Sequence, residues 1–190
     1  DHRDLHSFPT RRSSDLALTA AVAAAVPASA QSEPANNQVS RGLYLSKIMG
    51  CNDCHTPWKL GAKGPEPDMS RMLSGHPQDM TLTPPPAPPA PWVMMGAATN
   101  TAFAGPWGIS FTANLTPDPD TGLGAWTEEM FVNAIRSGRH MGSQSRRILP
   151  PMPWPMQANL TDEDLTAIFA YLKTVPPIAN HVPDPIPPPS

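Results

Sequence analysis

Apolar residues recur at helical spacing in three separate stretches of the chain. In the first, residues 41–49, Tyr44 and Ile48 lie one turn apart and define an apolar face. Ser40 precedes this stretch and belongs to a residue type that caps helix N-termini. Gly50 follows it, as glycine commonly does after the last turn of a helix. The pattern predicts an amphipathic helix that begins near residue 39 and ends beside residue 51.

Two further helices are predicted in the second half of the chain. Thr127 and Thr161 are N-cap residue types, and acidic residues fill the first turn after each of them, where they complement the helix dipole. The first of these helices stops at Gly138 and the second before Pro176. The predicted buried positions are Phe131, Ala134 and Ile135 in one helix, and Leu165, Ile168, Phe169 and Leu172 in the other.

The rest of the chain is rich in proline, which accounts for 27 of the 190 residues. Residues 61–105 show no clear periodicity and contain a proline run at 84–91 that favours polyproline II over helix or sheet. We therefore expect a long surface-loop insertion there. The tail, residues 178–190, is also proline-rich and is expected to be extended.

The N-terminal residues are interpreted separately from the fold. Residues 1–16 resemble a translated sequencing adapter and are read as an artefact of cloning or assembly. Residues 17–30 combine a short apolar run with Ala28-Ser29-Ala30, which resembles the remnant of a secretory signal peptide. The apolar run is shorter than the roughly 20 residues a membrane span needs. Residues 31–38 are expected to be a flexible leader, and the mature chain is expected to be exported to the periplasm without a membrane span.

Cys51-Asn52-Asp53-Cys54-His55 carries the most specific chemistry in the chain. The spacing C-x-x-C-H is typical of covalent haem attachment through two thioethers, with the histidine as the proximal iron ligand. A structural disulfide, a thioredoxin-like redox pair and half of a zinc site also use C-x-x-C. They fit less well, because the chain has only these 2 cysteines and its other histidines, such as His76 and His181, are scattered.

A second axial ligand is needed for a six-coordinate electron carrier, and a methionine thioether raises the reduction potential. Met152 is the leading candidate because prolines bracket it in a loop between two predicted helices. Met156 and Met141 are alternatives, and a histidine ligand or an open site also remains possible. The predicted cofactor-binding residues are thus Cys51, Cys54, His55 and Met152, with His55 and Met152 as the iron ligands; no catalytic residue is predicted.

Several short motifs follow one another in a fixed order along residues 39–177. They are Arg41-Gly42-x-Tyr44-Leu45, Cys51 to Pro57, Asn114-Leu115-Thr116-Pro117-Asp118, Thr121-Gly122-Leu123-Gly124-x-Trp126-Thr127, Pro151-Met152-Pro153-Trp154 and Leu160 to Leu165. As a set they resemble class I c-type cytochromes, and they are most similar to the cytochrome subunits and domains that accept electrons from bacterial alcohol and aldehyde dehydrogenases. The resemblance implies an all-α fold, with three or more helices around one covalently bound haem c and terminal helices that cross. It also places the distal ligand at Met152.

The resemblance also implies a function. We expect a single-haem electron carrier, not an enzyme, that contacts a periplasmic dehydrogenase and a downstream cytochrome or oxidase transiently. Related subunits often carry three haem motifs, whereas this sequence has one. The alternatives are a haem enzyme, for which His140 is the one candidate acid–base group, and a gas or redox sensor with an open or displaceable distal site. The net charge of −3 argues against a nucleic-acid partner.

Overall fold

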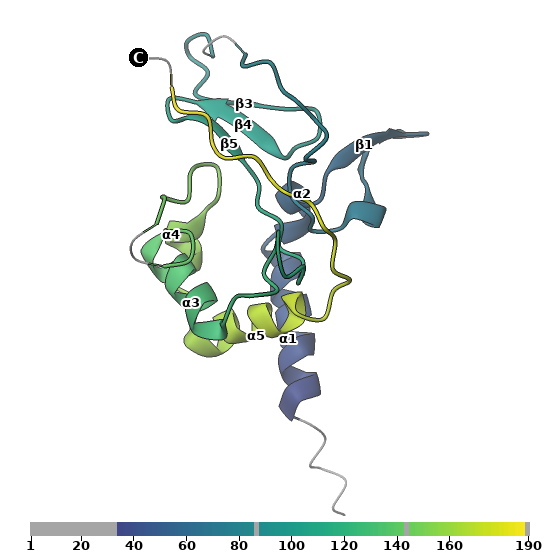
Figure 1. The fold of residues 1–190 in the computed structure, drawn as a ribbon, viewed down its shortest axis with the longest axis vertical. Helices are drawn as coiled ribbons and strands as arrows, with labels where there is room; N and C mark the ends of the chain where they lie inside the picture. The colour runs from purple at the N-terminus through teal and green to yellow at the C-terminus, as the bar shows by residue number, and fades with distance from the viewer. Residues whose placement is uncertain (1–33, 86–87, 143–144, 189–190) are drawn as a thin grey trace, which may run out of the picture. The chain divides into compact units, whose positions relative to one another are not determined.

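A computed structural model describes residues 34–85, 88–142 and 145–188, all within the unit Glu33–Ser190. The interpretations of residues 1–16, 17–30 and the start of the leader, 31–33, lie outside the described residues. Five α-helices occur in the described part of the chain (Figure 1). They are α1 (Pro34–Ile48), α2 (Cys51–His55), α3 (Glu128–Ser137), α4 (Trp154–Gln157) and α5 (Asp162–Leu172).

The two C-terminal helices predicted from the pattern are confirmed, together with their caps. Thr127 accepts a hydrogen bond from the Met130 amide, and Thr161 accepts one from the Asp164 amide. The first helix begins earlier than predicted, at Pro34, so that Ser40 lies inside it and does not cap it. Residues 35–38 contain no helix breaker, and proline is tolerated in a first helical turn because its missing N–H has no helical partner there.

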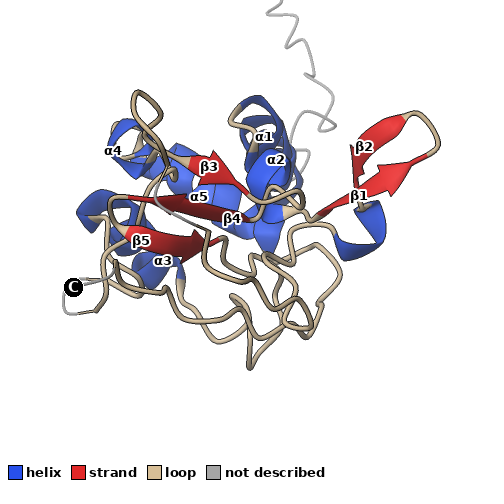
Figure 2. Ribbon diagram, turned by 90° about the horizontal axis from the view of Figure 1, so that it is seen from above, coloured by secondary structure: helices blue, strands red, loops and turns tan. Residues whose placement is uncertain are grey.

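The prediction of an all-α fold is wrong, because the described chain also forms two antiparallel sheets (Figure 2). The strands are β1 (Trp58–Gly61), β2 (Gly64–Pro67), β3 (Met95–Gly96), β4 (Ala102–Gly105) and β5 (Gly108–Phe111), with a 3-10 helix at Met69–Arg71. In the three-stranded sheet β4 lies between β3 and β5, and Phe103 faces Ser110 in register. Such short strands carry too few residues for a period of two to stand out against the prolines around them. The fold is mixed α and β.

Residues 61–105 are also more than a surface insertion. They contain the strands β2, β3 and β4 and a fully buried segment at Leu73, Ser74 and His76, each with a relative exposure of 0%. The C-terminal tail joins the same region, because Ile186 pairs with Ile109 of β5 through two backbone hydrogen bonds. Both segments are therefore part of the packed structure.

The hydrophobic core lies among α1, α3 and α5. Its buried members are Leu45, Leu73, Leu123, Phe131, Ile135, Leu165, Ile168, Phe169, Leu172 and Val175. Helices α1 and α5 cross in close contact (Figure 1), and Gly42 of α1 lies directly against the backbone of Ala167 and the side chain of Tyr171 on α5. A side chain at Gly42 would collide with the Ala167 carbonyl group, so this crossing requires glycine.

In the ranges that the structure describes, no helix is both long enough and apolar enough to cross a lipid bilayer.

Replacing Gly42 with alanine should separate α1 from α5 and lower the free energy of unfolding by about 1–3 kcal/mol or more, because overpacked contacts to backbone cannot relax easily. Chemical unfolding followed by circular dichroism measures the change. Gly96→Ala is the control, since a Cβ there would meet only the Phe103 ring, at 3.4 Å. Equal stability of the two variants would contradict the crossing geometry.

Candidate functional site

The C-x-x-C-H motif forms the short helix α2 at the C-terminal end of α1. Gly50 separates the two helices with φ +67°, a left-handed conformation that glycine adopts at low cost. Its amide donates to the Lys47 carbonyl, and its carbonyl accepts from the Asp53 amide, so one residue ends α1 and begins α2. Cys51 and Cys54 are both free thiols. The helical turn presents two unpaired thiols and an imidazole within five residues.

The His55 ring is held by a carbonyl from a distant part of the chain. Its Nδ1 lies 2.8 Å from the carbonyl oxygen of Ala113, and His55 is 8% exposed. A carbonyl oxygen can only accept, so Nδ1 carries the proton and Nε2 keeps its lone pair. Burial lowers the pKa of His55 and outweighs the opposing effect of the Ala113 carbonyl. The imidazole is therefore neutral near pH 7, with Nε2 available as a ligand.

Two backbone segments flank this histidine and bond to each other. The amides of His76 and Leu115 donate to the carbonyls of Thr112 and Leu73, which joins residues 73–76 to residues 112–115. The Gly75 amide donates to the His55 carbonyl at 2.8 Å. Gly75 has φ +76°, and a Cβ there would lie 2.5–2.7 Å from backbone atoms of Thr112 and Ala113. Glycine is what allows the two segments to approach so closely behind His55.

The two cysteine thiols are protonated at neutral pH. Burial raises the pKa of Cys51 to about 11 and also raises the pKa of Cys54. Cys51 packs against the hydrophobic core, and the end of α1 fixes its direction. Neither thiol lies in the electropositive environment that activates the thiolate of a redox pair.

The three candidate methionine ligands differ sharply in their surroundings. Met152 is half-buried and packs against the same core that Cys51 borders. Met156 and Met141 are 69% and 50% exposed. An axial ligand has to be shielded from water and held in place, and among these three only Met152 meets both conditions.

Two contacts anchor the segment that carries Met152. Ser110 of β5 donates a hydrogen bond of 2.6 Å to the Pro150 carbonyl, just before Met152. Trp154, just after it, packs its ring against the backbone of Gly138 at the end of α3. The three-stranded sheet and α3 thus fix the two ends of the Pro-Met-Pro segment.

Comparison with known proteins finds several relatives, although no protein-family profile matches the chain. The chain is 28% identical over 149 residues to the cytochrome c subunit of the quinone alcohol dehydrogenase of Gluconobacter oxydans, which covers 77% of this chain and 24% of the relative. It is 29% identical over 143 residues to the gluconate 2-dehydrogenase cytochrome c subunit of Pantoea cypripedii, with 75% and 24% covered. It is 39% identical over 77 residues to the alcohol dehydrogenase cytochrome c subunit of Gluconacetobacter polyoxogenes, with 40% and 16% covered.

The chain is thus similar in sequence to cytochrome c subunits of dehydrogenases. This confirms the family resemblance inferred from the ordered motifs. The chain spans about a quarter or less of the length of these relatives.

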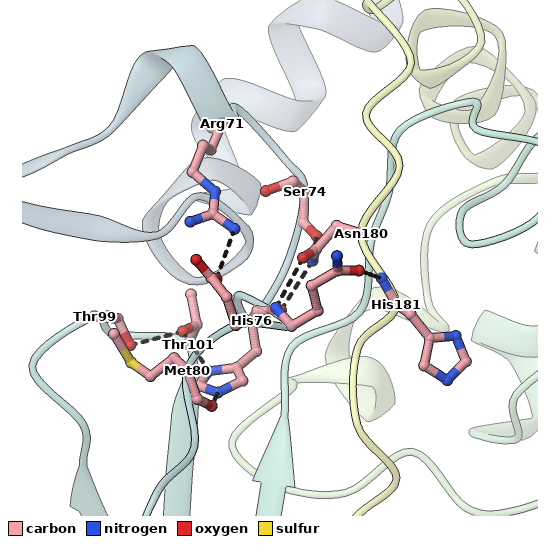
Figure 3. A network of polar contacts seen from close by, with 10 residues as sticks. Arg71, Ser74, His76, Met80, Thr99, Thr101, Asn180 and His181 are labelled. Carbon is pink, nitrogen blue, oxygen red and sulfur yellow. Dashed lines mark hydrogen bonds and ion pairs between the residues drawn. The ribbon is translucent and has the colours of Figure 1, made fainter.

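The other histidines of the chain lie elsewhere in the fold. His140 packs edge-on against Trp126, with ring centroids 5.1 Å apart. His76 is fully buried: its Nε2 lies 3.3 Å from the Met80 carbonyl and its Nδ1 lies 2.9 Å from the Thr101 hydroxyl (Figure 3). None of the hydrogen bonds found in the described residues joins either ring to α2 or Met152. No sequence pattern indicated Ala113 or Gly75 as a contact of His55, because backbone atoms supply both contacts.

The burial of the His76 side chain predicts that the protein loses stability in mild acid. Burial lowers the pKa of His76 below the ordinary value of 6.5, so below about pH 6.5 the unfolded chain takes up a proton that the folded chain excludes. The free energy of unfolding should fall between pH 7.5 and pH 5, with this residue contributing up to about 1.4 kcal/mol per pH unit. Denaturant unfolding at both pH values, compared between wild type and His76→Gln, should show a smaller fall in the variant.

The control for this titration is His181→Gln, because the His181 side chain is exposed. It should retain the wild-type fall. An identical fall in His76→Gln and wild type would exclude His76 as its source.

Proposed function

We propose that this chain is a periplasmic electron-transfer cytochrome with one haem c, attached covalently to Cys51 and Cys54, whose iron is ligated by His55 and Met152. The observation that carries the proposal is the state of α2: two free thiols and a neutral, buried imidazole whose Nδ1 proton is bound to the Ala113 carbonyl. This donor set matches what covalent haem attachment and proximal ligation require. Haem supplies one-electron chemistry at its iron when it is bound.

Each residue has a separate task in this proposal. Cys51 and Cys54 anchor the cofactor, so it stays bound in both oxidation states. The Nδ1 bond to Ala113 fixes the His55 tautomer and ring orientation and increases the basicity of Nε2. Met152 supplies a thioether, a weaker ligand that favours the reduced state and raises the potential.

The apolar surroundings support a large, flat cofactor. Half-buried apolar side chains pack against the core from several elements and leave part of their surface uncovered. They include Met49, Met72, Leu115, Trp126, Val132 and Met152. Burial of such surface against a porphyrin is favourable at about 25 cal/mol per Å² and excludes water from the iron ligands. The residues present therefore fit haem.

The proposed partners are a periplasmic dehydrogenase that donates electrons and a cytochrome or oxidase that accepts them. The names of the relatives support this, since each is a cytochrome c subunit of a dehydrogenase. Two arguments support a periplasmic location. Residues 17–30 resemble a signal peptide, and in the c-type cytochromes that the chain resembles, the thioether bonds to haem form outside the cytoplasm.

An optical spectrum tests the proposed function. The chain, expressed with a haem-maturation system and exported, should show a reduced c-type spectrum, a near-infrared sulfur–iron band when oxidised, and no shift with carbon monoxide. Haem should stay with the polypeptide after acid–acetone extraction. Absence of covalent haem would overturn the proposal, and rapid carbon monoxide binding would favour an enzyme or a sensor with an open site.

Two methionine variants test the distal ligand. Met152→Ala should abolish the sulfur–iron band and open the iron to carbon monoxide, because its half-buried thioether is the proposed ligand. Met156→Ala is the matched control, four residues away and 69% exposed, and should keep both wild-type properties. The reverse result would move the ligand to Met156.

A further inference from the structure

Asn180 brings a buried amide from the C-terminal tail into the interior of the fold. The residue is 2% exposed, although prolines surround it in sequence. Its Nδ2 donates to the carbonyls of Ser74 at 2.7 Å and His76 at 2.9 Å, and its Oδ1 accepts from the Gln78 amide at 2.9 Å. Figure 3 shows the Asn180 amide directed at Ser74 and His76. One side chain thus satisfies three backbone groups of a single turn.

The turn that Asn180 holds is one of the two segments behind His55. Gly75 lies between the two carbonyls that Asn180 binds, and its own amide donates to the His55 carbonyl. The next amide, that of His76, donates to Thr112, beside the Ala113 carbonyl that orients the His55 ring. A shift of this turn would therefore move both backbone contacts of His55.

The backbone of the same tail residue holds the other segment. The Asn180 amide donates to the Thr121 hydroxyl at 3.0 Å, and its carbonyl accepts from Asn114 Nδ2 at 3.4 Å. Asn114 also donates to the Ile178 carbonyl at 2.8 Å, and it directly follows Ala113. Asn180 is thus hydrogen-bonded both to the turn at residues 74–78 and to residues of the segment that follows the Ala113 carbonyl, the acceptor of the His55 ring.

We propose that Asn180 is a positioning residue that clamps residues 74–76 to residues 113–121 and so sets the strength of the His55 Nδ1–H···O=C bond. This rests on the proposed function, in which Nε2 of His55 ligates the haem iron. A strong Nδ1 hydrogen bond makes the imidazole a better donor and stabilises the oxidised iron. Loosening the clamp weakens the bond, so the reduction potential rises and the Nδ1 proton exchanges faster with solvent.

The experiment compares the holoprotein with Asn180→Ala and Asn180→Leu. Both variants remove the Nδ2 donor and the Oδ1 acceptor without adding a charge, and leucine keeps nearly the same size if alanine prevents accumulation of the holoprotein. The potential is measured by spectroelectrochemistry, and exchange of the His55 Nδ1 proton by nuclear magnetic resonance of the reduced protein. We expect an upward shift of the potential and roughly tenfold or faster exchange, since the three side-chain hydrogen bonds to the turn are lost.

Gln78→Ala is the matched control. The Gln78 side chain is exposed and accepts from the His181 amide at 2.7 Å. Only the backbone amide of Gln78 bonds to Asn180, and alanine keeps that amide. The variant should loosen the tail locally and leave the potential and the Nδ1 exchange at wild-type values.

The outcomes separate this inference from the proposed function. If wild type carries no covalent haem, the proposed function fails. If wild type carries haem and both Asn180 variants keep its potential and Nδ1 exchange while losing only thermal stability, Asn180 is merely structural and the inference is overturned. Equal shifts in Gln78→Ala would likewise overturn it, because they would assign the effect to the tail as a whole.

Discussion

The hydrogen bond between the His55 ring and the Ala113 carbonyl is the constraint on which the site depends. An imidazole offers a lone pair in a fixed direction only when its other nitrogen is occupied, and here the partner lies 58 residues further along the chain. The nearby carbonyls of α2 have other partners, since that of Asn52 accepts from the Thr56 amide and that of Asp53 from the Trp58 and Asn100 side chains. The site can therefore exist only after residues far apart in sequence have packed together.

Much of the non-helical structure holds the Ala113 carbonyl in place against the His55 ring. Residues 73–76 and 112–115 bond to each other behind His55, and the tail at Asn180 bonds to both. Closing loops of this length costs conformational entropy. Full burial of Leu73 and the near-complete hydrogen bonding of the Asn114 and Asn180 amides offset that cost. Proline lowers it further, because a chain with fixed φ angles has less freedom to lose on folding.

The helices have the complementary role of bringing α2 and the Met152 segment to one core. Gly42 lets α1 cross α5 closely, and Gly50 turns the chain from α1 into α2. Gly138 ends α3 and accommodates Trp154, which follows Met152. Three glycines thus determine where the two proposed ligand segments lie. Gly42 acts through close contact with a neighbouring helix, Gly50 through a left-handed backbone, and Gly138 through both.

The sequence alone determined the elements whose information is local. The C-x-x-C-H spacing, the caps at Thr127 and Thr161 and the apolar stripes of α3 and α5 depend on residues within a few positions of each other, so they could be read directly. The ordered motifs also carried the resemblance to dehydrogenase cytochrome c subunits. Only the tertiary structure decided the two sheets, the burial of Leu73 and the partners of His55, because these depend on backbone groups brought together over long distances. A backbone carbonyl or amide is the same for every residue type, so no sequence pattern distinguishes Ala113 or Gly75 as a contact of His55.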